Sequence, residues 1–482
     1  MTVSGLFTIG SVPQDESKIW GNNFQVADQI SWTHGKHTVR TGFEIAWNQK
    51  NWNFLGLAIG NITFDSFPDF LLGLPGCSSA QILAGCSATT PAPGTNGTAF
   101  SNIFNTGTFS SVTPPTGIIH AFRARGGSAF VQDDFKVTQR LTVNLGLRWE
   151  YDGFVWDKYG EVNDIWPAEI NTVPIPGTTP ATGTLAGFVV PSNFILANWP
   201  TPPVGGIYQN THRVPTQNNP QLDNFAPRVG LAWQPTKSDR FVVRAGFGFF
   251  YDYTGFGLYD ISVTQAEPYA ITIVENGTAN YFSSEAQPYA PTPLEWTPRW
   301  VNFATGASSN IADYIMQQKY VTPLTYEYNL NTQYEFLPNW VLEVGYVGSR
   351  GIHQSVTSQQ INGAQLVGNP LGTNTINAPG ITAGLVTTNT AANASLRVPY
   401  LGFAPTGLNQ EGVDGYDKFN SLQVTVRKQM SHGLSMQAAY TWSRAFTTGA
   451  STTTATATAT TLSSNDPNNA AQQYGLSGGY YP

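Results

Sequence analysis

Pairs of amphipathic β-strands joined by very short turns alternate along this chain with very long connections. We expect five such turns, roughly one hundred residues apart, at His34-Gly35, Thr138-Gln139, Lys237-Ser238, Leu337-Pro338 and Ser431-His432. The long connections between them cover about residues 49–127, 153–226, 253–323 and 351–416. A soluble β-domain has no physical reason to sort its loops by length. A barrel in an outer membrane does, because its periplasmic turns are short and its extracellular loops are long.

The strand after the second turn shows the underlying pattern most clearly. Its apolar side chains share one face: Leu141, Val143, Leu145, Leu147, Trp149 and Tyr151. Its small or polar side chains share the other: Thr142, Asn144, Gly146, Arg148, Glu150 and Asp152. A period of two is that of a β-strand, and it recurs in the other hairpins. We expect strands of about 9–11 residues, the length of a tilted membrane crossing.

The composition favours a surface that faces lipid. Charged residues make up 11% of the chain, against roughly 25% in soluble proteins. Aromatic residues make up 13%. No apolar run approaches the ~18–20 residues that a spanning helix needs, and a closed barrel is the other structure that satisfies every backbone group in lipid. The prediction is therefore an all-β, antiparallel, up-and-down transmembrane barrel with about ten strands. The barrel is expected to be partial, because a barrel protein without a signal peptide is expected to be a fragment.

Several classes of function find no support in the sequence. The net charge of −7 and the scattered Lys and Arg residues disfavour a nucleic-acid partner. No nucleophile-elbow, Walker or Rossmann pattern stands out, so we expect no enzyme, no cofactor and no metal site. The segment from His34 to His37 is expected to be a solvated turn. Asp133 and Asp134 could be paired carboxylates for acid–base work, but a lumen-facing or strand-end pair is the favoured interpretation.

Two groups of residues are candidates for function on the barrel wall. Charged residues on the predicted inner face could contact a plug, line a substrate path or simply pair with one another: Arg40, Glu44, Arg148, Glu150, Arg228, Arg244 and Glu343. Aromatic residues at the ends of the apolar stripes are expected to form two girdles at the membrane interfaces: Trp32, Trp47, Trp149, Tyr151, Trp233, Tyr251, Tyr440 and Trp442. Glycine also recurs on the inner face, at positions 42, 146, 230, 246, 248 and 345. A close-fitting plug or barrel curvature would explain those glycines equally well.

The only two cysteines, Cys77 and Cys86, are nine residues apart in a segment rich in Gly, Ser and Pro. An external loop lies in an oxidising compartment, so a disulfide that closes this loop is predicted. Two unpaired thiols are the alternative. A metal site is disfavoured because no second Cys or His pair stands at ligand spacing.

Six segments together resemble the barrel of Oar-like TonB-dependent transporters: residues 69–75 (DFLLGLP), 130–135 (FVQDDF), 141–150 (LTVNLGLRWE), 225–233 (FAPRVGLAW), 343–351 (EVGYVGSRG) and 440–444 (YTWSR). The resemblance covers about residues 20–446. It implies a location in the outer membrane of a Gram-negative-type bacterium. It also implies passage of an unidentified external ligand, energised by the TonB–ExbB–ExbD complex, through a barrel of about 22 strands.

The pattern of that family also includes a signal peptide, a small carboxypeptidase-regulatory-like domain and a plug that TonB contacts. We find none of these in the sequence, and the N-terminus has no basic start or apolar core. The expectation is a single partial barrel domain, residues 1–482, from a longer transporter, with TonB acting through the missing plug region and the lipid bilayer surrounding the strands. Two alternatives stay open: a passive porin-like or adhesive outer-membrane barrel, and a soluble extracellular repeat β-protein that binds carbohydrate.

Overall fold

The structure is a computed structural model of the whole chain. It describes residues 2–10, 18–53, 61–64, 67–73, 77, 79–93, 95, 97, 103–110, 119–167, 188–195, 208–213, 220–252, 270–276, 313–364, 390–391, 394, 408–431, 433–448 and 475–476. Within these residues, no helix is long and apolar enough to cross a membrane.

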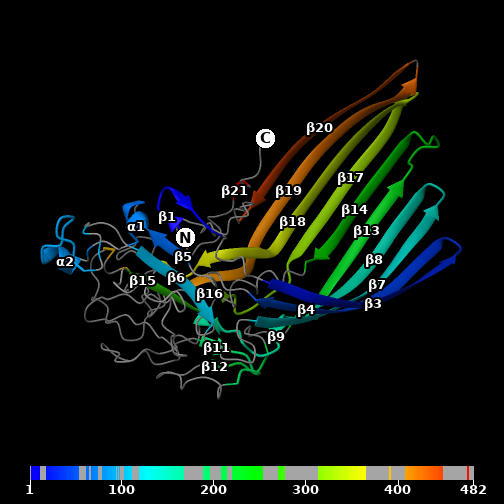
Figure 1. Ribbon diagram of the computed structural model, residues 1–482. Helices are drawn as coiled ribbons and strands as arrows, with labels where there is room; N and C mark the ends of the chain where they lie inside the picture. The colour runs from blue at the N-terminus through cyan, green and yellow to red at the C-terminus, as the bar shows by residue number, and fades with distance from the viewer. Residues whose placement is uncertain are drawn as a thin grey trace.

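Ten long strands form one curved, open antiparallel sheet in which each strand pairs with the next long strand of the sequence (Figure 1). They are β3 (Lys18–His34), β4 (His37–Asn53), β7 (Ile119–Thr138), β8 (Leu141–Asp152), β13 (Asn224–Trp233), β14 (Phe241–Tyr251), β17 (Leu324–Leu337), β18 (Trp340–Gln360), β19 (Leu408–Ser431) and β20 (Leu434–Thr447). Short strands β9 (Trp156–Asp157), β16 (Asp313–Met316) and β21 (Gly475–Leu476) bring the sheet to 13 strands. The predicted up-and-down fold is confirmed, and the described strands leave the barrel unclosed between β3 and β21.

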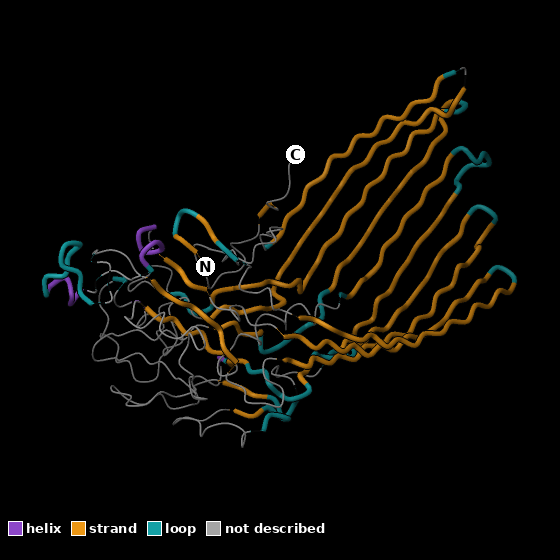
Figure 2. The backbone as a smooth tube through the Cα atoms, viewed as in Figure 1, coloured by secondary structure: helices purple, strands orange, loops and turns teal. Residues whose placement is uncertain are grey.

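The described hairpin turns lie together at one end of the sheet, and the described parts of the long connections lie at the other (Figure 2). We call these the turn end and the loop end. Four of the five expected turns fall within described residues, and His432 of the fifth lies outside them. The first, second and fourth turns are each one residue later than predicted, at Gly35-Lys36, Gln139-Arg140 and Pro338-Asn339. In the first of them Gly35 has the left-handed φ of 60° that glycine adopts at no steric cost.

Eight of the ten long strands are longer than the predicted 9–11 residues, and this is a correction; β13 and β14, with 10 and 11 residues, match the prediction. The longest, β19, has 24 residues, and β4, β7, β18 and β19 continue as paired ribbons into segments that were assigned to loops. Strand pairing gives the backbone hydrogen-bond partners whether or not lipid surrounds it. The predicted membrane crossing is therefore only part of each ribbon.

Smaller elements gather at the loop end (Figure 1). A five-stranded sheet there contains β15 (Ala270–Asn276), β6 (Ile103–Ser110), β5 (Asn61–Phe64), β1 (Thr2–Val3) and β2 (Phe7–Thr8). A three-stranded sheet contains β10 (Asp164–Ile165), β11 (Phe188–Val190) and β12 (Tyr208–Gln209). Two short helices accompany them, α1 (Phe67–Leu72) and α2 (Ser79–Leu83). Two segments of the long connections thus form local strands, residues 61–64 in β5 and 270–276 in β15.

The register gives the main sheet two different faces. Across β8 and β13, Leu145 lies opposite Val229 on one face, and Asn144 lies opposite Gly230 on the other. On the apolar face large side chains stay open to the surroundings, with Leu145 48% and Val229 47% exposed. Buried apolar side chains instead form a cluster at the loop end: Trp52, Phe122, Ala124, Val155, Val162, Met316, Tyr320 and Val413.

Candidate functional site: the polar face of the sheet

All seven predicted inner-face charges lie on the polar face. One cross-strand row on this face contains Arg40, Gln132, Gly146, Arg228, Gly248 and Glu327. The next row towards the turn end contains Asp134, Asn144, Gly230, Gly246 and Asn329. Glu44, Arg148, Glu150, Arg244 and Glu343 lie on the same face in rows farther toward one end or the other.

Several of these charges are engaged within the wall. Arg40 forms an ion pair with Asp134, and Arg148 Nε donates to Glu150 Oε1 at 2.5 Å along the same strand. Arg244 donates to the amide oxygen of Gln333 at 3.3 Å. These contacts are the barrel-wall pairs that the sequence left open as one interpretation. Partly exposed pairs of this kind stabilise a fold by about 0–1 kcal/mol each.

Arg228 is held differently from the other cations. Its guanidinium lies 4.4 Å from the centre of the Phe250 ring, an arrangement in which the ring face attracts the cation. Among the described residues, no carboxylate lies within ion-pair distance of Arg228. Its hydrogen-bond donors are therefore not engaged by an acidic side chain of the described wall.

The pair Asp133 and Asp134 does not form one site, because adjacent residues of a strand point to opposite faces. Asp134 lies on the polar face and accepts hydrogen bonds from Asn144 at 2.5 Å and Gln132 at 3.2 Å. Asp133 lies on the apolar face near the turn end, 2.6 Å from Nδ1 of His37. The acid–base alternative for this pair is therefore wrong on geometry.

A hollow of about 280 Å³ opens in the polar face over the middle strands β7, β8, β13, β14 and β17. Its floor contains four glycines, and polar or charged side chains surround them. The residues that line it with side chains on the polar face are Gln132, Asn144, Gly146, Arg228, Gly230, Gly246, Gly248, Phe250, Glu327 and Asn329.

Sequence reasoning identified Arg228 and the glycines but missed the rest of the rim. The residues that were not predicted are Gln132, Asn144, Phe250, Glu327 and Asn329. They are uncharged, or they lie in strands for which the prediction used the apolar side chains. Each lies an even number of residues from a named polar-face residue of its strand or of the paired strand's row. Because alternate residues of a strand point to the same face, a list of every second residue would have included them. That five strands bring them around one hollow depends on the register, which the sequence does not reveal.

The predicted girdle residues lie on the apolar face. Trp32, Trp47, Trp233, Tyr440 and Trp442 are between 41% and 65% exposed. Trp149, Tyr151 and Tyr251 are half-buried towards the loop end, and the indole of Trp149 donates to the backbone oxygen of Leu222 at 2.8 Å. Their arrangement in two interface belts stays a prediction.

Buried polar groups at the loop end form hydrogen bonds that hold its segments together. Asp157 is fully buried and accepts backbone hydrogen bonds from Ala121 at 2.6 Å, Tyr159 at 2.8 Å and Glu161 at 3.1 Å. Burial lowers the pKa of His120, against the opposing effect of Asp157. Burial raises the pKa of Asp164 well above its usual value. These groups have no counterpart in the predicted site, because nothing in the local sequence marks them.

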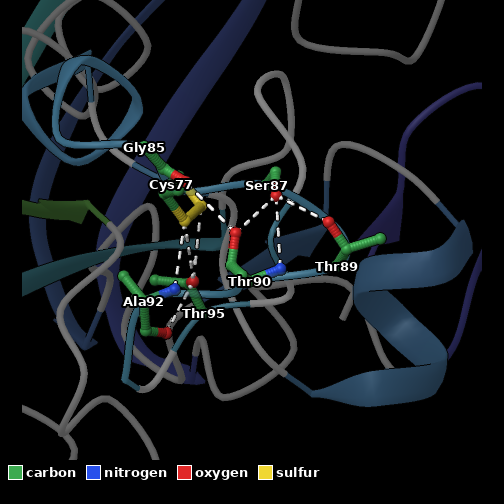
Figure 3. The surroundings of a disulfide bond; sticks show 8 residues. Cys77, Gly85, Ser87, Thr89, Thr90, Ala92 and Thr95 are labelled. Carbon is green, nitrogen blue, oxygen red and sulfur yellow. Dashed lines mark hydrogen bonds between the residues drawn. A yellow bond between two sulfur atoms is a disulfide. The ribbon is translucent and has the colours of Figure 1, made fainter.

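Cys77 and Cys86 form a disulfide at the loop end (Figure 3). The Ala92 backbone N–H points at Cys86 Sγ, 3.1 Å away, and Thr95 Oγ1 donates to the Ala92 oxygen at 2.8 Å. The bond ties α2 to the short bridge between Ser87 and Thr90. Among the described residues, no group of three or more His, Cys, Asp or Glu side chains could hold a metal ion.

Comparison with known proteins gives a family match. The sequence matches the model of a family described as outer membrane beta barrel domain over residues 1–480. No curated protein sequence matches the chain.

Solved structures of outer-membrane proteins are similar to the chain at low identity. The outer membrane transporter YddB from Escherichia coli is 8% identical with a TM-score of 0.42, over 90% of this chain and 34% of that chain. The ferripyoverdine receptor of Pseudomonas aeruginosa is 10% identical with a TM-score of 0.34, over 89% and 33%. The CymD monoaromatic hydrocarbon channel is 11% identical with a TM-score of 0.23, over 89% and 69%. The chain thus spans about a third of the length of the first two.

Proposed function

This chain belongs to the outer membrane beta barrel domain family and lies in the outer membrane, and we propose that it forms part of the wall of an energised, TonB-dependent transporter. In this proposal the external loops capture a ligand, and the polar face lines the lumen through which the ligand passes. The six sequence segments that resemble Oar-like transporters support it. The soluble carbohydrate-binding alternative does not fit a member of this family.

The polar face is the observation that carries the proposal. A passive porin selects its solutes with rings of like charge in a constriction. Here Arg40 pairs with Asp134 and Arg148 pairs with Glu150, so these four charges are paired with opposite charges within the wall. The wall offers instead a hollow with a glycine floor and amide rim, a surface suited to contact with a body inside the lumen.

Other parts of the working transporter would lie outside this chain. We propose that residues 1–482 form one barrel domain and that the TonB–ExbB–ExbD complex acts on a plug outside them. Energy then comes from the inner membrane, so no side chain here needs to break or form a covalent bond. The family itself is not an enzyme family.

A measurement of ion conductance distinguishes an energised transporter from a passive channel, and it does not require the ligand to be known. The intact natural protein, purified and placed in a planar bilayer, should show no steady current, because a plugged barrel is closed at rest. It should also bind the purified periplasmic domain of TonB. A steady ohmic current together with no TonB binding would establish a passive channel and overturn the proposal.

An adhesive barrel is the second candidate, because the loop-end helices expose large apolar side chains. Leu83 in α2 is 90% exposed, Leu71 in α1 is 66% exposed and Phe67 is 42% exposed. Phe67 and Leu71 are four residues apart on one helix and therefore share a face, and an apolar patch on a surface often marks an interaction site. If adhesion is the function, Leu83→Ser should reduce the attachment of expressing cells to one another while conductance stays unchanged.

A further inference from the structure

The described hairpin turns are joined to one another along the turn end (Figure 2). In each pair of neighbouring hairpins, a backbone N–H of one hairpin donates at 2.8 Å to the backbone oxygen of a turn residue in the other. The turn residues that accept these bonds are Lys36, Arg140, Arg240 and Asn339. Three of the four are cations, so positive charges are held at successive junctions between hairpins.

A fourth cation, Lys237, lies in the connection between β13 and β14. We call Lys36, Arg140, Lys237 and Arg240 the basic row, and all four are exposed. Lys36 Nζ donates to the backbone oxygen of Val137 at 2.8 Å, a bond that leaves its charge unneutralised. Among the described residues, no carboxylate lies within ion-pair distance of Lys36, Arg140 or Lys237.

Acidic residues of the turn end neutralise the basic row only in part. Arg240 Nε lies 3.9 Å from Glu335 Oε2, which is too long for a hydrogen bond. Asp239 is exposed in the same connection as Arg240. The four described turns contain four cations and one acid, a formal charge of +3, whereas the whole chain carries −7. The turn end therefore attracts anions although the protein as a whole repels them.

Two tryptophans indicate where the basic row lies relative to a bilayer. Trp32 lies near the end of β3 and Trp233 ends β13, and on the apolar face they are 57% and 45% exposed. Tryptophan is enriched where the hydrocarbon of a membrane meets its headgroups. The turns follow directly after these positions, and long basic side chains extend towards the interface. The basic row is therefore at the level of the lipid phosphates.

The charge of the row distinguishes among phospholipid headgroups. Every phospholipid has a phosphate, which accepts charge-assisted hydrogen bonds from Arg and Lys. Phosphatidylethanolamine also has an ammonium group that the row repels, whereas phosphatidylglycerol has only hydroxyls beside its phosphate. Each Lys or Arg next to a membrane strengthens the attraction of anionic lipid by about fivefold. An acidic soluble protein would match the charge of the row but not the exposed tryptophans beside it.

We propose that the basic row binds anionic phospholipids of the periplasmic leaflet. Their phosphates lie on Lys36, Arg140 and Lys237, and their acyl chains lie on the apolar face beside Trp32 and Trp233. Short turns of outer-membrane barrels face the periplasm, which selects this leaflet. The proposal goes beyond the proposed function, because it concerns the lipid around the barrel and holds for an energised transporter and a passive channel alike.

Local fluorescence quenching tests the proposal. The two native cysteines form a disulfide, so Gln139→Cys supplies one free thiol for a small fluorophore, next to Arg140. Pro338→Cys is the matched position, since Gln139 and Pro338 each begin a two-residue turn and the turn at Pro338 contains no cation. The intact protein is placed in phosphatidylethanolamine vesicles. Phosphatidylglycerol or phosphatidylethanolamine with brominated acyl chains is then added at equal mole fraction, and the quenching by the two lipids is compared.

The expected result is a lipid preference at one turn only. At Gln139→Cys, phosphatidylglycerol should associate about fivefold more strongly than phosphatidylethanolamine, and at Pro338→Cys the two lipids should quench equally. Salt at about 1 M, where the Debye length is about 3 Å, should remove most of the preference.

Charge variants show whether the basic row is the cause. Replacing Lys36, Arg140 and Lys237 together by glutamine should abolish the preference at Gln139→Cys. Lys136→Gln is the matched control, because Lys136 lies at the same end but on the polar face, opposite Thr142. It should leave the preference unchanged.

Three results would overturn the proposal. They are equal association of the two lipids at Gln139→Cys, a preference that the triple variant retains, and the same preference at Pro338→Cys. Circular dichroism of each variant in vesicles verifies that the strands have formed before quenching is measured. The measurement needs neither TonB nor the transported ligand, so its failure would leave the transport proposal to the conductance test.

Discussion

The long strands and the loop end of this molecule are stabilised in different ways. On the strands, apolar side chains such as Leu145 and Phe247 remain 48% and 45% exposed to whatever surrounds the protein. At the loop end, Phe122, Val155 and Val162 are no more than 1% exposed. The first region requires lipid to cover its apolar face, whereas the second has a protein core of its own. We call them the strand wall and the loop-end core.

This difference separates the forces on which each region depends. The strand wall has a continuous ladder of backbone hydrogen bonds, and its apolar face gains its stability from the membrane. The loop-end core depends on side-chain packing and on buried polar groups whose partners must all be present. Changes that act on lipid contact and changes that act on buried hydrogen bonds should therefore affect different regions.

The largest expected effect is at the loop-end core. Asp157→Ala leaves the backbone N–H groups of Ala121, Tyr159 and Glu161 without their common acceptor. Each lost bond to a charged group, buried as these are, costs about 1.5–3 kcal/mol, partly offset by relaxation. We expect a loss of about 3–5 kcal/mol of local stability, measured by hydrogen exchange of residues 153–167.

The matched control is Asp414→Ala. Asp414 is another loop-end carboxylate, but it is exposed and accepts hydrogen bonds from the side-chain amide of Gln317 at 3.1 Å. It should change exchange by an amount equivalent to about 1 kcal/mol or less. If Asp157→Ala speeds exchange in β8 and β13 as strongly as at residues 153–167, the two regions are not independent.

A second change acts on lipid contact. Leu145→Lys places a charge on the apolar face in the middle of the strand wall, where lipid cannot solvate it. The expected loss is about 2–4 kcal/mol of folding stability in a bilayer, read from urea titrations of the protein in vesicles. Thr425→Lys is the control, because Thr425 lies on the polar face opposite Glu343. Equal losses for both variants would contradict the assignment of faces.

The disulfide gives a third and more local test. Cys86→Ser opens the nine-residue span between Cys77 and Cys86, which on the chain-entropy account costs about 2–3 kcal/mol. We expect faster proteolysis within residues 79–93 and no shift in the denaturation of the strand wall. Mild reduction of the native protein should reproduce the result. If the strand wall of the variant denatures at a lower temperature or denaturant concentration, the disulfide stabilises more than its own loop.

The smallest effect depends on pH at the junction of the two regions. Burial, with Glu150 and Asp252 nearby, raises the pKa of Asp152 to about 6. When the pKa of a carboxyl group is higher in the folded state than in the unfolded state, the unfolded state loses its proton first as the pH rises. The free energy of unfolding therefore falls between the unfolded-state pKa and about pH 6. Asp152→Asn should therefore stabilise the protein by about 1 kcal/mol above pH 6, after solvent screening.

That gain should shrink towards pH 4 and disappear below about pH 3, where the carboxyl is protonated in both the folded and the unfolded state. Thermal melting at several pH values measures it, and Asp414→Asn controls for the loss of one negative charge. A gain for Asp152→Asn that is the same at pH 4 and pH 8 would rule out the titration of this carboxyl as its cause.

The faces of the strands could be predicted from sequence because alternation is local. Each residue from Leu141 to Asp152 points opposite to its neighbour whatever the strand pairs with, so the seven inner-face charges could be named. Four of the hairpins follow for a similar reason, since a turn of two residues fixes its own pairing, whereas seven residues separate β13 from β14. The lengths of β7, β18 and β19 could not be predicted, because their loop-end pairing depends on partners far away in the sequence.

Only the tertiary structure decided which residues of distant strands come together in one site. The rim of the hollow comes from five strands, and the register alone brings Gln132 of β7 and Asn329 of β17 around the same glycines. The loop-end core joins Phe122, Val155, Met316 and Val413 from four distant segments. Alternation along one strand does not indicate which strands become neighbours or the register in which they pair. The sequence by itself therefore determined that this chain is an amphipathic β wall, and long-range pairing decided which residues share a site.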